Sequence, residues 1–275
     1  MARVRLARSG DVPELRRLCR AAAGPDDYVA DFLPEMVRRG EAVVVEASGR
    51  LVTMGGVATC VDGALWIGQL RTHPDFRRRG YATMLLADAY ARAARERRPA
   101  LRLYTGWRNP SRSLYERMGF REVAHFTRLA APPLWRGAPP LARAQDGRGA
   151  FHLWRSSPFG AAGAGYVGYR WHMVPITRRL LDALAGRGEV LVGDGSALLA
   201  WVEPGSRAAY AAVLGEGRTG LRAARAAAAW LRRARVEVFA PRDPRILRWA
   251  RESGFDPASW GRHLVLYEQR VRRRR

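Results

Sequence analysis

Residues 77–79 are three consecutive arginines that lie in a turn between an apolar run, 64–72, and an amphipathic helical pattern. Pro74 ends the apolar run, because proline cannot donate to a strand ladder. Gly80 and Ala82 keep the first helical turn free of bulky side chains. Guanidinium groups, unpaired backbone N–H groups and the positive end of a helix dipole all favour a bound polyphosphate. A solvated basic loop that caps the helix is the alternative interpretation.

Alternation and helical spacing predict the elements that position this turn. Residues 2–7 alternate and predict a half-buried strand, while 41–47 and 51–61 predict a hairpin around Ser48-Gly49-Arg50. The other elements expected in the first half are helices at 13–23, 28–39, 81–97 and 110–118 and strands at 64–72, 100–105 and 120–129. This order predicts an α/β fold, an α+β mixed sheet with helices packed on it.

The second half repeats this pattern more weakly. Residues 131–149 are rich in Pro, Gly and Ala without a period, which predicts a linker. Beyond it we expect strands at 151–155, 189–193, 197–203, 208–214, 236–240 and 262–267, helices at 176–185, 219–234 and 244–252, and a turn at Asp194-Gly195-Ser196. Asn109-Pro110 opens one short helix and Asp243-Pro244 opens another, and both end in Gly-Phe. Duplication therefore predicts domains at 1–130 and 150–275, the second with a basic tail at 272–275.

The composition limits the class of protein. The net charge is +23, and all 48 basic residues are arginine. The absence of Lys, with one Asn and three Ile, is typical of a GC-rich genome. That origin weakens the case for nucleic acid, so we expect no such partner, although the field attracts phosphates and acidic ligands.

The cysteines and histidines predict no disulfide framework and no bound metal, and the apolar runs predict no membrane span. Cys19 and Cys60 are too few for a disulfide framework, and no residues have metal-ligand spacing. No apolar run approaches the roughly 18 residues of a spanning helix, and the charged N-terminus lacks the apolar core of a signal peptide. We expect a cytoplasmic protein that contacts no membrane.

The arginine turn and the segment after Asn109 together resemble the GNAT superfamily of N-acetyltransferases. Arg77-x-x-Gly80-x-Ala82 matches that family's Q/R-x-x-G-x-G/A loop, which holds the pyrophosphate of acyl-CoA. Asn109, Tyr115 and Gly119-Phe120 match its second motif. The resemblance covers 3–129 with good specificity and 150–268 with weaker specificity. It implies two tandem GNAT-like acyl-CoA N-acyltransferase modules with acetyl-CoA as cosubstrate.

The resemblance implies a role for each matching residue. Leu70 and Thr72 would offer backbone groups of a splayed strand to the pantetheine arm, although Thr72 replaces a more usual aliphatic residue, and Asn109 would contact the same arm. The residues expected to line the pyrophosphate are Arg77, Arg78, Arg79, Gly80, Tyr81, Ala82 and Thr83. Tyr115 would protonate the departing thiolate, since a phenol of pKa about 10 suits a thiol of pKa about 8.5–10. The structural alternatives stay open: Asn109 as a helix N-cap alone, and Tyr115 as a half-buried core aromatic.

The second module departs from the motif. Trp249 or Ala250, depending on the alignment, stands where Tyr115 does, and neither can donate a phenolic proton. The loop 215–220 carries one Arg and one Glu in place of three Arg. We therefore expect a degenerate copy that completes the sheet and walls the acceptor pocket, an internal pseudo-dimer within a monomer.

Two functions compete. The first is an enzyme that moves an acetyl group from acetyl-CoA to a primary amine of a small molecule or peptide by direct attack. The alternative is a non-catalytic GNAT-fold module that binds CoA or an anionic partner as a sensor or scaffold. Retention of Asn109 and Tyr115 favours the enzyme. The general base stays open among Glu41, Asp62 and a bound water, and the sequence does not identify the acceptor amine.

Overall fold

The computed structural model describes residues 1–193 and 195–271, so the predicted turn residue Asp194 and the arginine run 272–275 lie outside the described residues. The chain forms two compact units. Unit 1 comprises Met1–Leu103, Pro110–Arg121 and Tyr267–Arg275, and unit 2 comprises Tyr104–Asn109 and Glu122–Leu266. These bounds differ from the expected 1–130 and 150–275, because the end of the last strand belongs to unit 1 and most of 104–131 belongs to unit 2.

Unit 1 contains a mixed sheet, as the sequence predicts. Strands β1 to β4 pair antiparallel in chain order, and β5 runs parallel to β4. Its elements are β1 (Ala2–Leu6), η1 (Ser9–Asp11), α1 (Val12–Ala23), α2 (Val29–Arg38), β2 (Ala42–Ala47), β3 (Arg50–Thr59), β4 (Leu65–Thr72), η2 (Pro74–Phe76), α3 (Tyr81–Arg95), α4 (Arg112–Arg117), the start of β5 (Ala100–Gly106) and the end of β15 (Leu264–Arg270).

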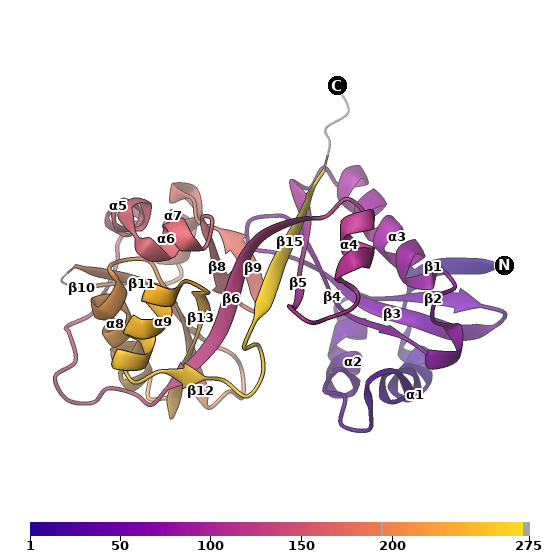
Figure 1. Ribbon diagram of the computed structural model, residues 1–275, viewed down its shortest axis with the longest axis horizontal. Helices are drawn as coiled ribbons and strands as arrows, with labels where there is room; N and C mark the ends of the chain where they lie inside the picture. The colour runs from indigo at the N-terminus through magenta and orange to yellow at the C-terminus, as the bar shows by residue number, and fades with distance from the viewer. Residues whose placement is uncertain (194, 272–275) are drawn as a thin grey trace. The chain divides into compact units, whose positions relative to one another are not determined.

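Helices cover both faces of this sheet (Figure 1). A Cβ placed on Gly55 would lie 3.2 Å from Leu85 of α3, and one on Gly56 would lie 2.8 Å from Met36 of α2. Because successive strand residues point to opposite faces, α3 and α2 lie on opposite sides of the sheet. On the α2 side the core combines helix α1, helix α2 and the sheet through Leu15, Leu18, Cys19, Leu33, Val44 and Met54.

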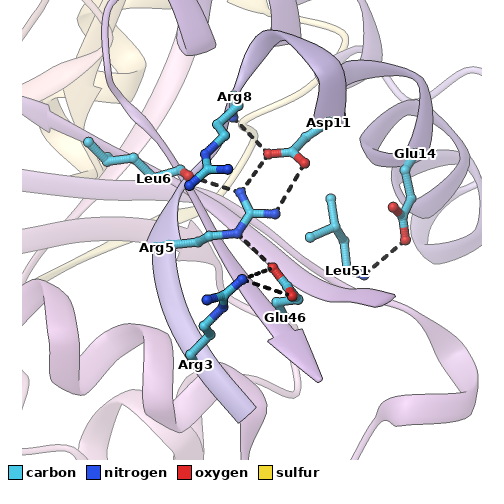
Figure 2. A network of polar contacts seen from close by, with 8 residues as sticks. All are labelled: Arg3, Arg5, Leu6, Arg8, Asp11, Glu14, Glu46 and Leu51. Atoms are coloured by element: carbon cyan, nitrogen blue, oxygen red, sulfur yellow. Dashed lines mark hydrogen bonds and ion pairs between the residues drawn. The ribbon is translucent and has the colours of Figure 1, made fainter. Parts of the chain in front are cut away.

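Charged groups hold the N-terminal strand and first helix of unit 1 together (Figure 2). Arg5 on β1 donates to Glu46 on β2 at 2.8 Å and to Asp11 at the start of α1 at 2.7 Å. The Arg5 guanidinium holds the pKa of Asp11 below its ordinary value, mainly through this hydrogen bond. Glu14 of α1 accepts from the backbone N–H of Leu51 at 2.9 Å. These contacts fix α1 against the β2–β3 hairpin.

Unit 2 repeats the strand pattern of unit 1. Strands β10, β11 and β12 pair antiparallel, and β13 runs parallel to β12. Strand β7 extends the sheet beside β10, and β6 pairs antiparallel with both β13 and β14. Its elements are the end of β5, β6 (Arg121–Ala131), β7 (Ala142–Arg143), α5 (Arg148–Ser156), α6 (Pro158–Ala162), β8 (Tyr166–Tyr169), β9 (His172–Pro175), α7 (Arg178–Ala185), β10 (Val190–Gly193), β11 (Ser196–Val202), β12 (Ala208–Val213), α8 (Gly217–Trp230), β13 (Arg235–Pro241), α9 (Pro244–Glu252), β14 (Asp256–Pro257) and the start of β15.

Two local signals explain the helices of this repeat. The Asp243 carboxylate accepts from the backbone N–H groups of Arg245 and Ile246 at 2.8 and 3.1 Å, which confirms it as the N-cap of α9. Helix α8 is rich in alanine and lies close to the sheet, since a Cβ on its Gly220 would stand 2.4 Å from Val213 of β12.

Three sequence predictions in unit 2 are wrong or incomplete. The strand predicted at 151–155 is part of helix α5, in which Ala150 and Trp154 are buried one helical turn apart. The glycine-rich stretch before 176 contains the hairpin β8–β9, whose turn residues Arg170 and Trp171 have φ of +47° and +65°. Neither is a residue typical of that conformation, so the turn left no sequence signal. Part of the predicted linker 131–149 also forms β7, paired with β10.

Candidate functional site

Strand β4 separates from its parallel neighbour early. Its pairs with β5 are Leu65↔Leu101 and Trp66↔Arg102, and the described ladder ends there although β4 continues to Thr72. Gln69 has φ of +50°, and the β3–β4 register shifts opposite it. The bulge therefore lies in the part of β4 that has no β5 partner, and residues 67–72 form an unpaired edge on that side of the strand.

The two β4 residues predicted to bind the pantetheine arm lie along this unpaired edge. The carbonyl oxygen of Leu70 accepts from Arg71 at 3.2 Å, and that of Thr72 accepts a long bond from Arg77 at 3.4 Å. The Thr72 and Thr53 hydroxyls lie 3.0 Å apart. The side chain of Thr72 is therefore used between β3 and β4, which leaves its backbone as the group for any ligand.

All three arginines of the turn are exposed, but only the Arg77 guanidinium makes a hydrogen bond among the described residues. Arg77 donates to the carbonyl oxygen of Ala22 at 2.8 Å and so closes the C-terminal end of α1. Arg78 adopts φ of +61° and is exposed, as is Arg79. No ion pair of the described residues engages Arg78 or Arg79. Two of the three predicted phosphate-binding arginines thus remain available to an anion.

The arginine turn leads directly into the start of α3. Gly80 has φ of +80°, a conformation that favours glycine, and a Cβ there would meet nothing within 4 Å. The first intrahelical bond joins the Met84 N–H to the Gly80 carbonyl, so the N–H groups of Tyr81, Ala82 and Thr83 precede it. No side chain caps this end, and no acidic residue lies in the first turn. The start of a 15-residue helix therefore offers open N–H groups and a positive dipole end to an anion.

An aromatic clamp that the sequence reading missed holds the turn. The guanidinium carbons of Arg50 and Arg79 each lie 5.4 Å from the ring centroid of Phe76. His73 packs edge-on against the same ring at 5.8 Å, and Tyr81 lies 6.3 Å away. Phe76 thus orients Arg79 through a cation–π contact. The signal available was an aromatic residue one position before the arginine run.

Tyr115 lies on α4 in a buried position. It is 8% exposed, its ring packs edge-on against Phe120 at 6.2 Å, and the ring of Tyr267 lies 6.0 Å away. No hydrogen bond among the described residues holds its hydroxyl. Burial raises the pKa of Tyr115 to about 12, although Arg71 acts in the opposite direction. The phenol is therefore protonated at neutral pH and able to donate.

The neighbouring phenol is held quite differently. Tyr267 of β15 donates to Glu116 at 2.9 Å and accepts from Arg112 at 2.9 Å. Burial raises the pKa of Tyr267 also. The sequence reading did not select it, because Tyr267 lies some 150 residues from its partners on α4.

A buried ion pair supports the same strand edge. Asp27, whose side chain is 1% exposed, accepts two bonds from Arg71 of β4 at 2.7 and 2.8 Å. The same guanidinium lies 5.8 Å from the ring centroid of Tyr28. This pair ties the α1–α2 connection to β4 beside the unpaired edge.

Asn109 belongs to unit 2. Its N–H donates to the Gly106 carbonyl at 2.9 Å. Helix α4 begins at Arg112, with Ser111 in the N-cap position. Asn109 therefore lies two residues before the N-cap position of α4, and its role stays a prediction.

The two carboxylates considered as general bases have different surroundings. Asp62 accepts from Arg102 at 2.7 Å, Arg102 also binds Glu268 at 2.7 Å, and the second Asp62 oxygen is buried without a partner. No described hydrogen bond or ion pair engages the Glu41 carboxylate, and burial raises its pKa.

No group of three potential metal ligands occurs in residues 1–193 and 195–271. Cys19 and Cys60 are buried free thiols, and burial raises the pKa of Cys19 to about 11 and that of Cys60 to about 12. Within the same part of the chain, no helix is long and apolar enough to cross a membrane.

In unit 2 the corresponding helix start is closed. A Cβ on Gly217, the first residue of α8, would stand 2.1 Å from the Trp249 ring. Glu216 occupies the N-cap, and Arg218 pairs with Glu252 at 2.6 Å. An aromatic ring and a carboxylate thus lie at the place where unit 1 has an open, arginine-rich turn.

Comparison with known proteins agrees with this geometry. Residues 38–122 match the family model described as "Acetyltransferase (GNAT) domain". A GCN5-related N-acetyltransferase from Sphaerobacter thermophilus matches with 17% identity and a TM-score of 0.63 over 98% of this chain and 96% of that chain. A solved structure from Thermoplasma acidophilum gives 17% identity and a TM-score of 0.63 over 98% and 99%. None of the curated proteins matches the sequence.

These matches define the class of fold and domain. The segment from the end of α2 to the start of β6 matches the model of a GNAT acetyltransferase domain. The full-length matches confirm the predicted mixed α/β fold and agree with a tandem arrangement.

Proposed function

We propose that unit 1 transfers an acetyl group from acetyl-CoA to a primary amine of a small molecule or peptide. The observation that carries the proposal is the start of α3. Open N–H groups, the positive helix end, Arg78 and Arg79 converge there, next to the unpaired edge of β4. This combination suits a pyrophosphate joined to an extended arm.

Different residues bind different parts of acetyl-CoA. The N–H groups of Tyr81, Ala82 and Thr83 receive the pyrophosphate, and Gly80 allows close approach because it has no side chain. Arg78 and Arg79 add charge-assisted contacts. Arg77 acts indirectly, because its guanidinium holds the turn against Ala22 of α1. The backbone of Leu70 and Thr72 receives the arm, which competes with Arg71 and Arg77 for their carbonyl oxygens. Asn109 is proposed to contact the same arm.

Tyr115 is proposed as the general acid. The neutral amine attacks the thioester carbonyl, the C–S bond breaks, and the sulfur takes the proton of the Tyr115 hydroxyl. The proton lost by the amine nitrogen leaves through water or a carboxylate, and it restores Tyr115. The raised pKa keeps the phenol protonated until the sulfur becomes basic. Glu41 and Asp62 both remain candidates for the proton acceptor.

Unit 2 is proposed as a degenerate copy without a donor site. Trp249 occupies the space in front of Gly217, and Glu216 is the N-cap residue of α8. A negative charge beside a helix start opposes the binding of a polyphosphate. One CoA per chain follows from this assignment.

A non-catalytic CoA-binding module is the second candidate, and one experiment separates the two. Calorimetry with CoA measures binding, and a thiol-release assay with acetyl-CoA against a panel of amines measures transfer. Thiol release that requires both an amine and the Tyr115 hydroxyl supports the enzyme. CoA binding without thiol release from any amine supports the binding module.

A further inference from the structure

Unit 2 contains an open cavity of about 990 Å³, well separated in sequence from the arginine turn. Its charged lining includes Arg108, Arg242, Arg251 and Arg262, with Asp256 as the one carboxylate among the described lining residues. This volume matches the sites that hold cofactor-sized molecules. A predominantly cationic lining selects for anions.

Three of these guanidiniums have no charged partner. The described residues provide no ion pair for Arg108, Arg251 or Arg262. Arg242 donates to the carbonyl oxygen of Arg262 at 3.1 Å and makes a long contact of 3.5 Å with the Thr127 hydroxyl. Arginine binds phosphate in a bidentate manner, so a phosphorylated ligand would satisfy groups that the protein itself leaves uncompensated.

A rigid aromatic pair lies in the same lining. Trp107 stacks on His263 with ring centroids 5.0 Å apart and an interplanar angle of 5°, and the backbone N–H of Trp107 donates to the backbone carbonyl of His263 at 2.9 Å. His263 is in turn hydrogen-bonded to the His125 ring at 2.7 Å, and His125 is bonded to Glu122. Trp107 nevertheless remains 41% exposed. A large indole held this firmly and left accessible is a platform for another flat ring.

The cavity lining also includes apolar side chains. Leu129, Leu247 and Phe255 contribute to its lining. Inorganic phosphate would use the arginines alone, and an uncharged aromatic molecule would use the indole and the apolar residues alone. We propose that this cavity binds a free nucleoside phosphate, with the phosphate at the arginines and the base against Trp107. The proposal is independent of acetyl transfer in unit 1.

The test is calorimetry of the full chain with AMP, with adenosine and inorganic phosphate as partial ligands. We expect one AMP site in unit 2 and binding at least about tenfold weaker for either partial ligand. Arg108→Ala and Arg251→Ala should each weaken AMP binding by about tenfold or more, as expected for loss of a charge-assisted contact. Trp107→Ala should weaken AMP and adenosine in similar proportion, since stacking acts on the base.

Two control variants separate this site from others. Arg155→Ala removes an exposed arginine of unit 2 outside the cavity and should leave AMP binding unchanged. Arg79→Ala should weaken CoA binding in unit 1 but not AMP binding. Circular dichroism confirms that each variant is folded.

Three results would overturn the proposal. The first is that Arg108→Ala and Arg251→Ala leave AMP affinity unchanged. The second is that inorganic phosphate binds as tightly as AMP, and the third is that Arg79→Ala abolishes AMP binding. A 5′-phosphorylated RNA tetranucleotide that binds more than tenfold tighter than AMP would overturn it in favour of nucleic acid.

Discussion

The Tyr115→Phe change removes a hydroxyl that no described hydrogen bond holds and keeps the ring against Phe120 and Tyr267. If Tyr115 protonates the departing thiolate, turnover should fall while CoA affinity and stability stay nearly unchanged. Within residues 1–193 and 195–271 the hydroxyl makes no hydrogen bond whose loss would weaken folding.

The pKa of Tyr115 sets the size of the effect. At pH 8, a phenol of pKa about 12 is protonated in all but about one molecule in ten thousand. Transfer of its proton to a thiolate of pKa about 8.5–10 is uphill by about 2–3.5 pKa units, or about 3–5 kcal/mol. A poorly matched acid contributes less, so we expect a loss of about 10²-fold, at the low end of the range for general acids. The same pKa predicts no loss of activity from this group as pH rises from 8 to 10.

The assay is thiol release from acetyl-CoA under conditions where chemistry limits turnover, with CoA affinity and melting temperature measured on the same samples. Tyr267→Phe is the matched control, because it removes a phenol that is bonded to both Arg112 and Glu116. That variant should lose about 1–3 kcal/mol of unfolding free energy. Tyr115→Phe should lose little stability and most of its rate.

Equal turnover for Tyr115→Phe and the unchanged protein would refute the acid role and leave Tyr115 as a core aromatic. A descending limb of turnover between pH 8 and 10 that disappears in Tyr115→Phe would instead contradict the raised pKa.

Three further predictions follow from the described contacts. Calorimetry should show one CoA per chain, and Arg79→Ala should weaken CoA binding by about tenfold or more. Arg77→Ala should mainly lower the melting temperature, because Arg77 holds the end of α1. Two equal CoA sites would contradict the degenerate assignment of unit 2. The pKa of Asp11 lies below its ordinary value of 3.8, so the stability that Asp11 contributes is complete above pH 3.8 and is lost as the pH falls through the pKa of Asp11 in the folded protein. Arg5→Met should reduce this loss of unfolding free energy at low pH, measured by urea titrations at pH 2–6. An unchanged loss would exclude the Arg5–Asp11 pair as its source. Asp243→Ala should cost about 0.5–2 kcal/mol of unfolding free energy in chemical denaturation, because two N–H groups of α9 lose their acceptor, and a change below that range would mean that solvent replaces the cap.

Sequence alone determined the features that depend on neighbouring residues. The order of strands and helices in unit 1 follows from apolar periodicity, so the mixed α/β fold was predictable. The position of the α9 N-cap at Asp243 follows from a short-range rule that the structure confirms. The arginine turn with Gly80 before α3 was also predictable from the sequence, because each contributing group lies within a few residues of the next.

Local rules failed where distant contacts overrode them. The strand predicted at 151–155 is helix α5, since a short alternating run does not distinguish strand from helix and tertiary burial of Ala150 and Trp154 decides. The turn at Arg170 and Trp171 has no glycine or asparagine to mark it. In both cases the energy that selects the conformation comes from packing, which a single sequence does not display.

Only the tertiary structure shows which group each candidate residue contacts. It directs Arg77 to Ala22 of α1 and leaves Arg79 on Phe76, although the two arginines are two positions apart. It also brings Tyr267 beside Tyr115 from the far end of the chain. Spacing specifies which groups are available in a turn, but direction and burial depend on partners many residues away, and those partners decide whether a guanidinium binds an anion or closes a helix.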